Sequence, residues 1–387
     1  MTVLRFLRPP ALSAGWVAAG FGSGAACAWA VDSSAAFTGL ISLPLWTCLG
    51  FLVLAIPGFL RPGGAWVGRY GLPLVITIGL ALFGFLLAAK WQAMASSDVI
   101  LGGLLPRSDA ANYLDGALHF LQFGELTAWT SRRPLSALHL AGLLEIGGSL
   151  HFALLALGIG SASAIATVIA VLGRTNGTAM AAGASAILVP FYFPSIGSFM
   201  SENIGLMLGS CGFALMWLAL YDDRRSTLFA LGAGCMALGL NARAGAMFVL
   251  PVLILYAGWK FRRTQRFSMS AASWTLVAIA AAFAINSGLL FLYGATKGGG
   301  FSNFSFTLYG LVSGGHEWTR IYQTMPDIRS LPEGEQAKEV YRLAMVHLAD
   351  HPGDLLRGII RRYNDFIFNA RWYRLEGIGA LRYGLMA

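Results

Sequence analysis

Long apolar segments alternate with short polar ones over most of the chain. Nine of these segments are long and apolar enough to predict membrane-spanning helices. They cover residues 11–31, 37–60, 71–91, 149–173, 178–194, 203–221, 227–240, 246–260 and 271–293. The segments at 227–240 and 246–260 are short for a full crossing, so a single broken hairpin that returns to its side of entry is an alternative.

Two regions depart from this pattern, and the first lies between the third and fourth predicted spans. Apolar side chains from Tyr113 to Leu121 recur there at helical spacing, which predicts an amphipathic helix in the membrane interface. A second helix is expected from Pro134 to Leu144, because proline is favoured in the first turn of a helix.

The second region begins at residue 294. Lys297 and three glycines predict a flexible connection, residues 327–349 predict a loop followed by a soluble helix, and Leu355 to Tyr363 predict a basic amphipathic helix on the bilayer surface. We therefore expect a transmembrane module at 1–293, which includes the outer loop 92–148, and a non-cytoplasmic tail at 294–387.

The composition agrees with a membrane protein. Of the 387 residues, 56% are hydrophobic and 12% are charged, whereas soluble domains are about one quarter charged. Segments of alternating hydrophobicity, which a barrel requires, do not occur in the sequence. The predicted fold is all-α: a polytopic transmembrane bundle of about nine helices with outer-face loops and interfacial helices. All four cysteines lie in apolar segments without metal-ligand spacing, so packing is expected for them and no metal site is predicted.

The net charge of +9 arises mainly from short loops. Basic residues favour cytoplasmic loops, which makes nucleic-acid binding the weaker explanation of this charge. With Arg5 and Arg8 in the cytoplasm before a retained first helix, the basic loops alternate with outer segments whose short turns, at 31–34 and 194–202, hold no base. This multi-pass topology, expected in a bacterial inner membrane, puts 92–148, the turns near Glu202 and Arg243, and the tail on the periplasmic or extracellular side.

Asp109 is the leading candidate for a catalytic group. It lies in a polar stretch between apolar regions, with Asn112 and Tyr113 as candidate substrate-binding neighbours. Asp109 and Tyr113 share one helix face if a helix begins there, because they are four residues apart. The alternative is that Ser108 or Asp109 merely caps that helix.

Glu202 and Arg243 are the next candidates. Glu202 is a second possible catalytic carboxylate and lies at the start of an apolar helix. The alternative is that it only interacts with the dipole of that helix from its first turn. Arg243 is a candidate for binding a donor phosphate, since guanidinium groups form bidentate bonds to phosphate, although it could simply extend to the lipid headgroups. Arg132, Arg133 and Lys297 are weaker candidates for the same task.

His316 lies in the segment 308–318, which we expect to be a loop that folds over a membrane site and contacts substrate. An ordinary surface histidine is equally compatible with the sequence. His119, His139 and His151 have no partner pattern, and we expect them to be structural.

These features resemble the polyprenyl-phosphate-dependent GT-C glycosyltransferases, which include protein mannosyltransferases and lipid A aminoarabinose transferases. The resemblance covers roughly residues 90–370. It is carried by the acidic position and Tyr113 in an outer loop, the sequence Arg-Arg-Pro-Leu at 132–135, Glu202 after a proline-containing turn, Arg243, the loop 309–318, and Asp-His-Pro-Gly at 350–353.

The resemblance implies an inverting, GT-C-like enzyme of the cell envelope. Such an enzyme would move a sugar from a polyprenyl-phosphate donor to a hydroxyl of a glycan, lipid or protein acceptor, with Asp109 as general base. The sequence departs from the family because Ala110 occupies the place of a second acid and the acidic loop follows the third span. A lipid phosphate is a good leaving group, so no metal cofactor is required, although a divalent cation stays open. A lipid-linked saccharide transporter or flippase and a polysaccharide polymerase or ligase are the alternatives.

Overall fold

The computed structural model describes residues 14–30, 50, 51, 53, 70–94, 96–221, 225–243, 247–262, 266–295 and 302–368. The regular structure in these ranges is helical apart from one two-stranded hairpin. Most of the predicted span at 37–60 lies outside the described residues, as does Lys297.

Four helices are long and apolar enough to cross a membrane: α5 (Leu72–Gln92), α8 (Leu150–Asn176), α10 (Ser201–Tyr221) and α13 (Met269–Tyr293). Four shorter helices, α2 (Ala14–Ala30), α9 (Thr178–Tyr192), α11 (Ser226–Ala242) and α12 (Val249–Lys260), stand at other predicted spans. The predicted helices are therefore confirmed at eight of the nine segments. A helix at each segment does not establish a membrane crossing at each. The 12 residues of α12 extend only about 18 Å, which is less than a hydrocarbon core of about 30 Å.

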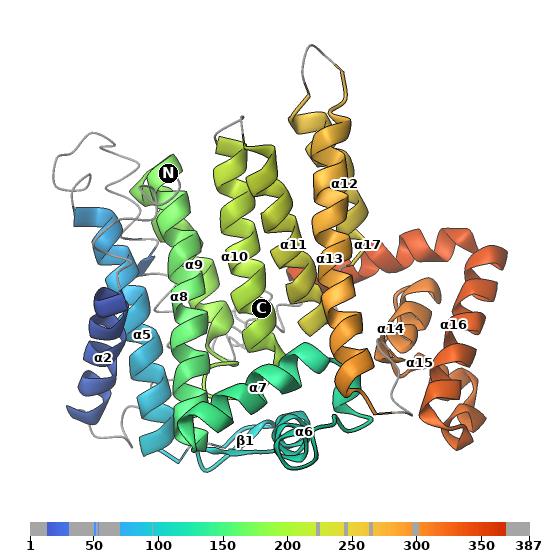
Figure 1. Cartoon of the computed structure of the whole chain (residues 1–387), viewed down its shortest axis with the longest axis horizontal. Helices are drawn as coiled ribbons and strands as arrows, with labels where there is room; N and C mark the ends of the chain where they lie inside the picture. Colours follow the sequence, from blue (N-terminus) through green and yellow to red (C-terminus); the bar gives the residue numbers. More distant parts are fainter. Residues whose placement is uncertain are drawn as a thin grey trace, which may run out of the picture.

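The long helices lie side by side (Figure 1), and small residues set their closest contacts. A Cβ on Gly84 of α5 would lie 1.9 Å from the carbonyl oxygen of Phe21 in α2. A Cβ on Gly212 of α10 would lie 2.6 Å from the carbonyl oxygen of Gly232 in α11. Glycine is required at these positions because the backbones themselves touch, which is typical of helix pairs in membranes.

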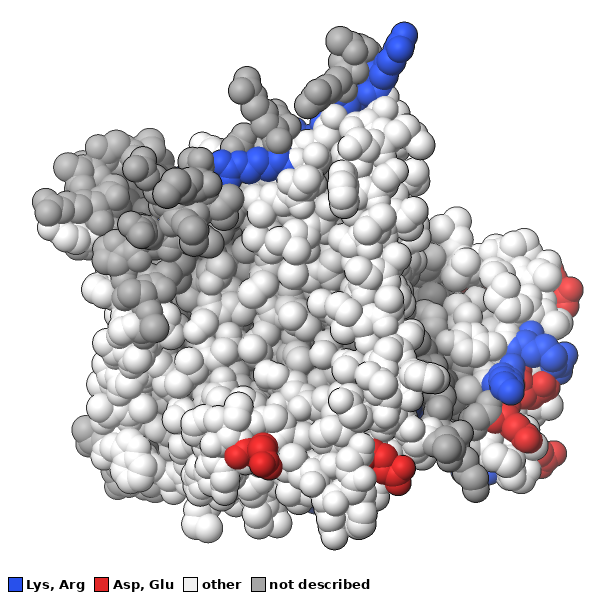
Figure 2. All heavy atoms as spheres, in the orientation of Figure 1, with Lys and Arg blue, Asp and Glu red and all other residues white. Residues whose placement is uncertain are grey.

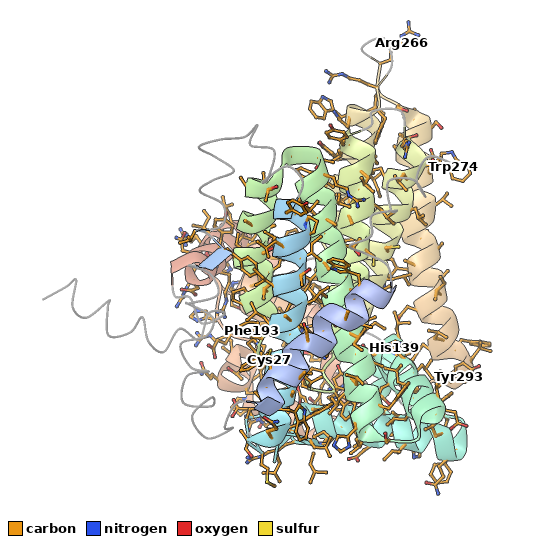
Figure 3. The ribbon with its side chains drawn as sticks, turned by 90° about the vertical axis from the view of Figure 1, so that its left-hand side faces the viewer. Cys27, His139, Phe193, Arg266, Trp274 and Tyr293 are labelled. Atoms are coloured by element: carbon orange, nitrogen blue, oxygen red, sulfur yellow. The ribbon has the colours of Figure 1, made fainter. Side chains whose placement is uncertain are left out.

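The two ends of the bundle differ in charge. The connections from α8 to α9, α10 to α11 and α12 to α13 lie at one end, which we call the basic end, and Arg266 marks it in Figure 3. Figure 2 shows Lys and Arg at this end, a broad uncharged belt below it, and Asp and Glu at the opposite end. On this face the two ends therefore differ in charge, while the membrane face that each end meets stays a prediction.

The opposite end, which we call the site end, holds the segment between α5 and α8. A short antiparallel hairpin of β1 (Ile100–Leu101) and β2 (Leu105–Pro106) precedes α6 (Asp109–Phe123), η3 (Thr130–Arg132) and α7 (Pro134–Gly147). The two helices predicted in this segment are confirmed as α6 and α7, while the place of α6 in the membrane interface stays a prediction. The hairpin was not predicted, because two-residue strands leave no periodic pattern in the sequence. In Figure 1, α6 and α7 lie across the lower end of the bundle.

Residues 302–368 form a C-terminal module beside α13 (Figure 1). It consists of α14 (Ser302–Val312), α15 (Arg320–Thr324), η4 (Pro326–Ser330), α16 (Glu333–Asp350) and α17 (Pro352–Phe368). Its own core contains Phe306, Ile321, Ile328 and Val340. The helices predicted within 327–349 and 355–363 are confirmed as α16 and α17, while the place of α17 on the bilayer surface stays a prediction. The loop predicted at 308–318 is wrong up to residue 312, because α14 buries Phe306 and Val312 and continues as a helix.

Candidate functional site

Tyr113 is the first side chain of the site. It points from α6 into the protein, is 2% exposed, and packs edge-on against Trp129 with 4.7 Å between ring centroids. Gly116, one turn later, allows this approach, since a Cβ there would lie 2.1 Å from Cγ2 of Thr130 in η3. The Tyr113 hydroxyl accepts a hydrogen bond of 2.6 Å from Nη1 of Arg133.

Arg133 is positioned by the start of α7. The residue before a proline is disfavoured in the α-helical region, and Arg133, which precedes Pro134, has φ −143° and ψ 65°, outside that region. The same Nη1 also donates to Oγ of Ser201 at 3.2 Å. Ser201, 1% exposed, is the first residue of α10, so Arg133 connects the segment 109–147 to one of the four long apolar helices.

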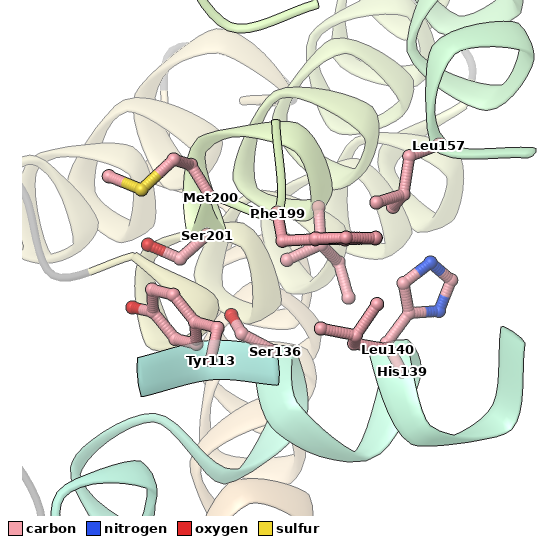
Figure 4. A pocket seen from close by; sticks show the side chains of 9 residues that line it. Tyr113, Ser136, His139, Leu140, Leu157, Phe199, Met200 and Ser201 are labelled. Carbon is pink, nitrogen blue, oxygen red and sulfur yellow. The ribbon is translucent and has the colours of Figure 1, made fainter. Parts of the chain in front are cut away.

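Arg243, at the end of α11, also contacts Ser201. The helices α10 and α11 are antiparallel, so the start of α10 meets the end of α11, and Gly205 leaves room for the Arg243 side chain. Nη1 of Arg243 donates to Oγ of Ser201 at 3.4 Å, and Nη2 lies 2.9 Å from Oε1 of Glu202. Figure 4 shows Ser201 beside Tyr113.

The site carries more positive than negative charge. Two guanidinium groups converge on one hydroxyl, and Glu202 compensates only one of them. Arg133 has no carboxylate partner within the described ranges. The side chains of Arg243 and Glu202 are 42% and 29% exposed, so a ligand can reach them. An anion with several oxygens, such as a phosphate, matches these donors.

A small cavity adjoins this cluster. It is lined by Tyr113, Ser136, His139, Leu140, Leu157, Phe199, Met200, Ser201 and Ile204 (Figure 4). Its volume of about 10 Å³ suits a single water molecule. His139, which we expect to be structural, lines this cavity, and burial lowers the pKa of its imidazole. Its spacing of three residues from Ser136 on α7 was the available sequence signal.

Lys90 supports the site from α5, although no role is predicted for it from the sequence. Its Nζ donates to the carbonyl oxygens of Phe193 at 3.0 Å and Ile196 at 2.9 Å. Phe193 lies at the site end of the bundle (Figure 3). Asn203 adds a bond of 2.8 Å from Nδ2 to the carbonyl of Ser198. These contacts hold the segment that leads into Ser201.

Asp109 and Asn112 lie at the edge of the cluster. Both are exposed, and neither forms a side-chain hydrogen bond or ion pair in the part of the chain that the structure describes. Asp109 opens α6 one turn before Tyr113 and therefore shares its face of the helix. Ser108 occupies the N-cap position with φ +55° but forms no hydrogen bond to the helix through its side chain. Asp109 is a carboxylate in the first turn of α6 and not its N-cap residue.

The other predicted residues are not gathered here. The guanidinium of Arg132 lies over the ring of Trp129 at 6.0 Å, and His316 belongs to the C-terminal module, where it faces three arginines. Within the described residues, no group of three or more His, Cys, Asp or Glu side chains is arranged to hold a metal ion.

Comparisons with known proteins give no relative from which a function could be inferred, so the function is inferred from the geometry of the site. No family model, curated protein or solved structure matches the chain.

Proposed function

We propose that this protein is an integral membrane glycosyltransferase that moves a sugar from a polyprenyl-phosphate donor to an acceptor hydroxyl. The observation that carries the proposal is the convergence of Arg133 and Arg243 on Ser201 with only one carboxylate between them. This arrangement suits the phosphate of a lipid donor, and the apolar helices around it suit the polyprenyl tail.

The two arginines would act mainly on the leaving group. As the bond between the sugar and the phosphate oxygen breaks, negative charge grows on that oxygen, and donors already aimed at it lower the barrier. Tyr113 orients Arg133 through its 2.6 Å hydrogen bond. Glu202 holds Arg243 by a partly exposed ion pair, which a bound phosphate would share or displace.

Asp109 would supply the base. Its carboxylate is exposed and unpaired among the described residues, one helical turn from Tyr113. It would take the proton of the acceptor hydroxyl while the hydroxyl oxygen attacks the anomeric carbon from the face opposite the phosphate. The electron pair of the broken bond stays on the phosphate, and the sugar configuration inverts. We place this chemistry on the non-cytoplasmic side, following the distribution of basic loops.

A transfer assay on full-length protein in nanodiscs tests the proposal. The donors are tritiated undecaprenyl-phosphate sugars, and the acceptors are the lipid and glycan extracts of the host cell. Asp109→Asn should lose most transfer and keep undecaprenyl-phosphate binding, whereas the control Asp115→Asn, an exposed change elsewhere on α6, should keep both. Normal turnover in Asp109→Asn removes it from the mechanism. Binding without transfer by the unmodified protein favours a transporter, and repeated addition to a glycan favours a polymerase.

A further inference from the structure

The C-terminal module presents a second positively charged cluster, formed where α17 crosses the loop after α14. Gly315 has φ +79°, and a Cβ there would lie 2.9 Å from the Cα of Gly358. A Cβ on Gly358 would in turn lie 2.8 Å from the backbone nitrogen of Gly315. Because neither residue has a side chain, the backbones touch, and the next turn of α17 brings Arg361 and Arg362 beside His316.

Arginines from two elements, α15 and α17, lie near His316. Burial, followed by the positive charges of Arg320, Arg361 and Arg362, lowers the pKa of the imidazole, so His316 is a neutral hydrogen-bonding group among cations at neutral pH. A Cβ on Gly315 would lie 3.3 Å from Cβ of Arg361, which places the start of that side chain directly against the loop.

The acidic neighbours do not neutralise this cluster. Asp365 lies 3.9 Å from Nη1 of Arg362, and Arg320 donates at 3.0 Å only to the amide oxygen of Gln323. Neither Arg320 nor Arg361 has a carboxylate partner among the described residues, and Glu317, which is exposed, forms no ion pair there. An anion is therefore the ligand that this cluster lacks.

The opposite face of α17 is apolar and exposed. Leu356, Ile359, Ile360 and Tyr363 are 62%, 43%, 52% and 63% exposed, while Gly358 faces the module. In Figure 1, α17 lies across the direction of the bundle helices, and Figure 2 shows the adjoining upper surface of the module as uncharged, level with the uncharged belt. Such a helix, apolar on one side and basic beside it, matches the boundary between headgroups and acyl chains.

We propose that α17 and the loop at His316 form a binding site for the phosphate headgroup of an anionic phospholipid, held by Arg320 and Arg361. The apolar side chains of α17 enter the acyl region, and the exposed Trp318 lies at the headgroup level, where aromatic rings are favoured. This site is separate from the arginine pair of the proposed donor site. It would anchor the module to the bilayer beside the spanning helices.

Titration of delipidated full-length protein in nonionic detergent tests this site. The probes are short-chain phosphatidylglycerol, short-chain phosphatidylcholine and inorganic phosphate, each followed by native mass spectrometry. Phosphatidylglycerol should bind most tightly. Arg361→Gln should weaken that binding about fivefold, and Arg320→Gln with Arg361→Gln about 25-fold, because each basic group near a lipid surface contributes about 1 kcal/mol. Arg342→Gln, which removes a paired charge from α16, is the matched control and should change little.

Three results would overturn the assignment. An equal loss in Arg342→Gln and Arg361→Gln would mean that net charge alone attracts the lipid. Competition by inorganic phosphate at the same concentration would mean a site for a free anion. Unchanged phosphatidylglycerol binding in Ile360→Ser would mean that the apolar face takes no part. Arg133→Gln should leave this binding unaltered, so failure here and failure of the donor site are distinguishable.

Discussion

The Tyr113→Phe substitution is the most discriminating single change at the site. It removes only the hydroxyl oxygen that accepts the 2.6 Å bond from Arg133. The phenyl ring keeps its edge-on packing against Trp129, so the core around it should change little. What is lost is one of the two contacts that hold Nη1 of Arg133, the other being Ser201 at 3.2 Å.

The size of the effect follows from the kind of bond. A hydrogen bond to a charged group contributes about 1.5–3 kcal/mol, and the Tyr113 side chain is almost fully buried, so solvent screens it little. If the whole contribution serves to hold Arg133 against the leaving phosphate, kcat/KM falls roughly 10- to 150-fold, because 1.36 kcal/mol corresponds to tenfold.

The assay measures kcat/KM for sugar transfer together with the Tm of the purified full-length variant. Tyr309→Phe is the control, because it removes a tyrosine hydroxyl that bonds Thr324 in the C-terminal module. We expect Tyr309→Phe to transfer normally. The reasoning is refuted if Tyr113→Phe stays within about twofold of the unaltered protein while its Tm is unchanged.

Three further changes test the fold and the site. Gly212→Ala should lower the Tm, since its Cβ would lie 2.6 Å from a backbone oxygen of α11 and overpacking costs about 1–3 kcal/mol, whereas Gly209→Ala, with only a sulfur at 3.9 Å, should not. Ser136→Ala should reduce the free energy of unfolding by about 1–3 kcal/mol, because its 2.9 Å bond satisfies a buried carbonyl at the end of α11; an unchanged denaturant midpoint would contradict this. Glu202→Gln should change stability by less than about 1 kcal/mol, as its ion pair is partly exposed, and should tighten undecaprenyl-phosphate binding. A loss of transfer at saturating donor in Glu202→Gln would instead make Glu202 catalytic.

Most of the helical architecture was predictable because it depends on local apolar runs. The spans, the helix from Asp109 and the helix from Pro134 follow from hydrophobic periodicity and from proline in a first turn. The β1–β2 hairpin was not predictable. The helix that covers the first part of 308–318 was not predictable either, because the core that buries α14 is formed by α15, η4 and α16, which come later in the chain.

The site was predictable in part. The sequence brought Tyr113, Glu202 and Arg243 to one end, and the structure joins them through Arg133 and Ser201. The sequence could not rank Arg133 above Arg132. Which of these two adjacent arginines belongs to the site depends on which one faces α10, and that is set by the fold.

Two supporting residues were harder to assign from the sequence. Lys90 supports the site from α5, which is distant from it in the sequence, and His139 is marked only by its spacing from Ser136 on α7, which apolar periodicity does not rank. The position of Asp109 relative to the donor is set by where the donor binds, and a residue pattern alone does not predict that.

The affinity of the full-length protein for undecaprenyl phosphate tests the central claim most directly. It is measured in nanodiscs with excess phosphatidylglycerol, which occupies other anionic-lipid sites, for Arg133→Gln and for its neighbour Arg132→Gln. We predict that Arg133→Gln weakens binding roughly 10- to 150-fold, the equivalent of one charged hydrogen bond of about 1.5–3 kcal/mol, and that Arg132→Gln changes it less than about threefold. Equal losses in the two variants, or no loss in Arg133→Gln, would contradict a phosphate site between Arg133 and Arg243.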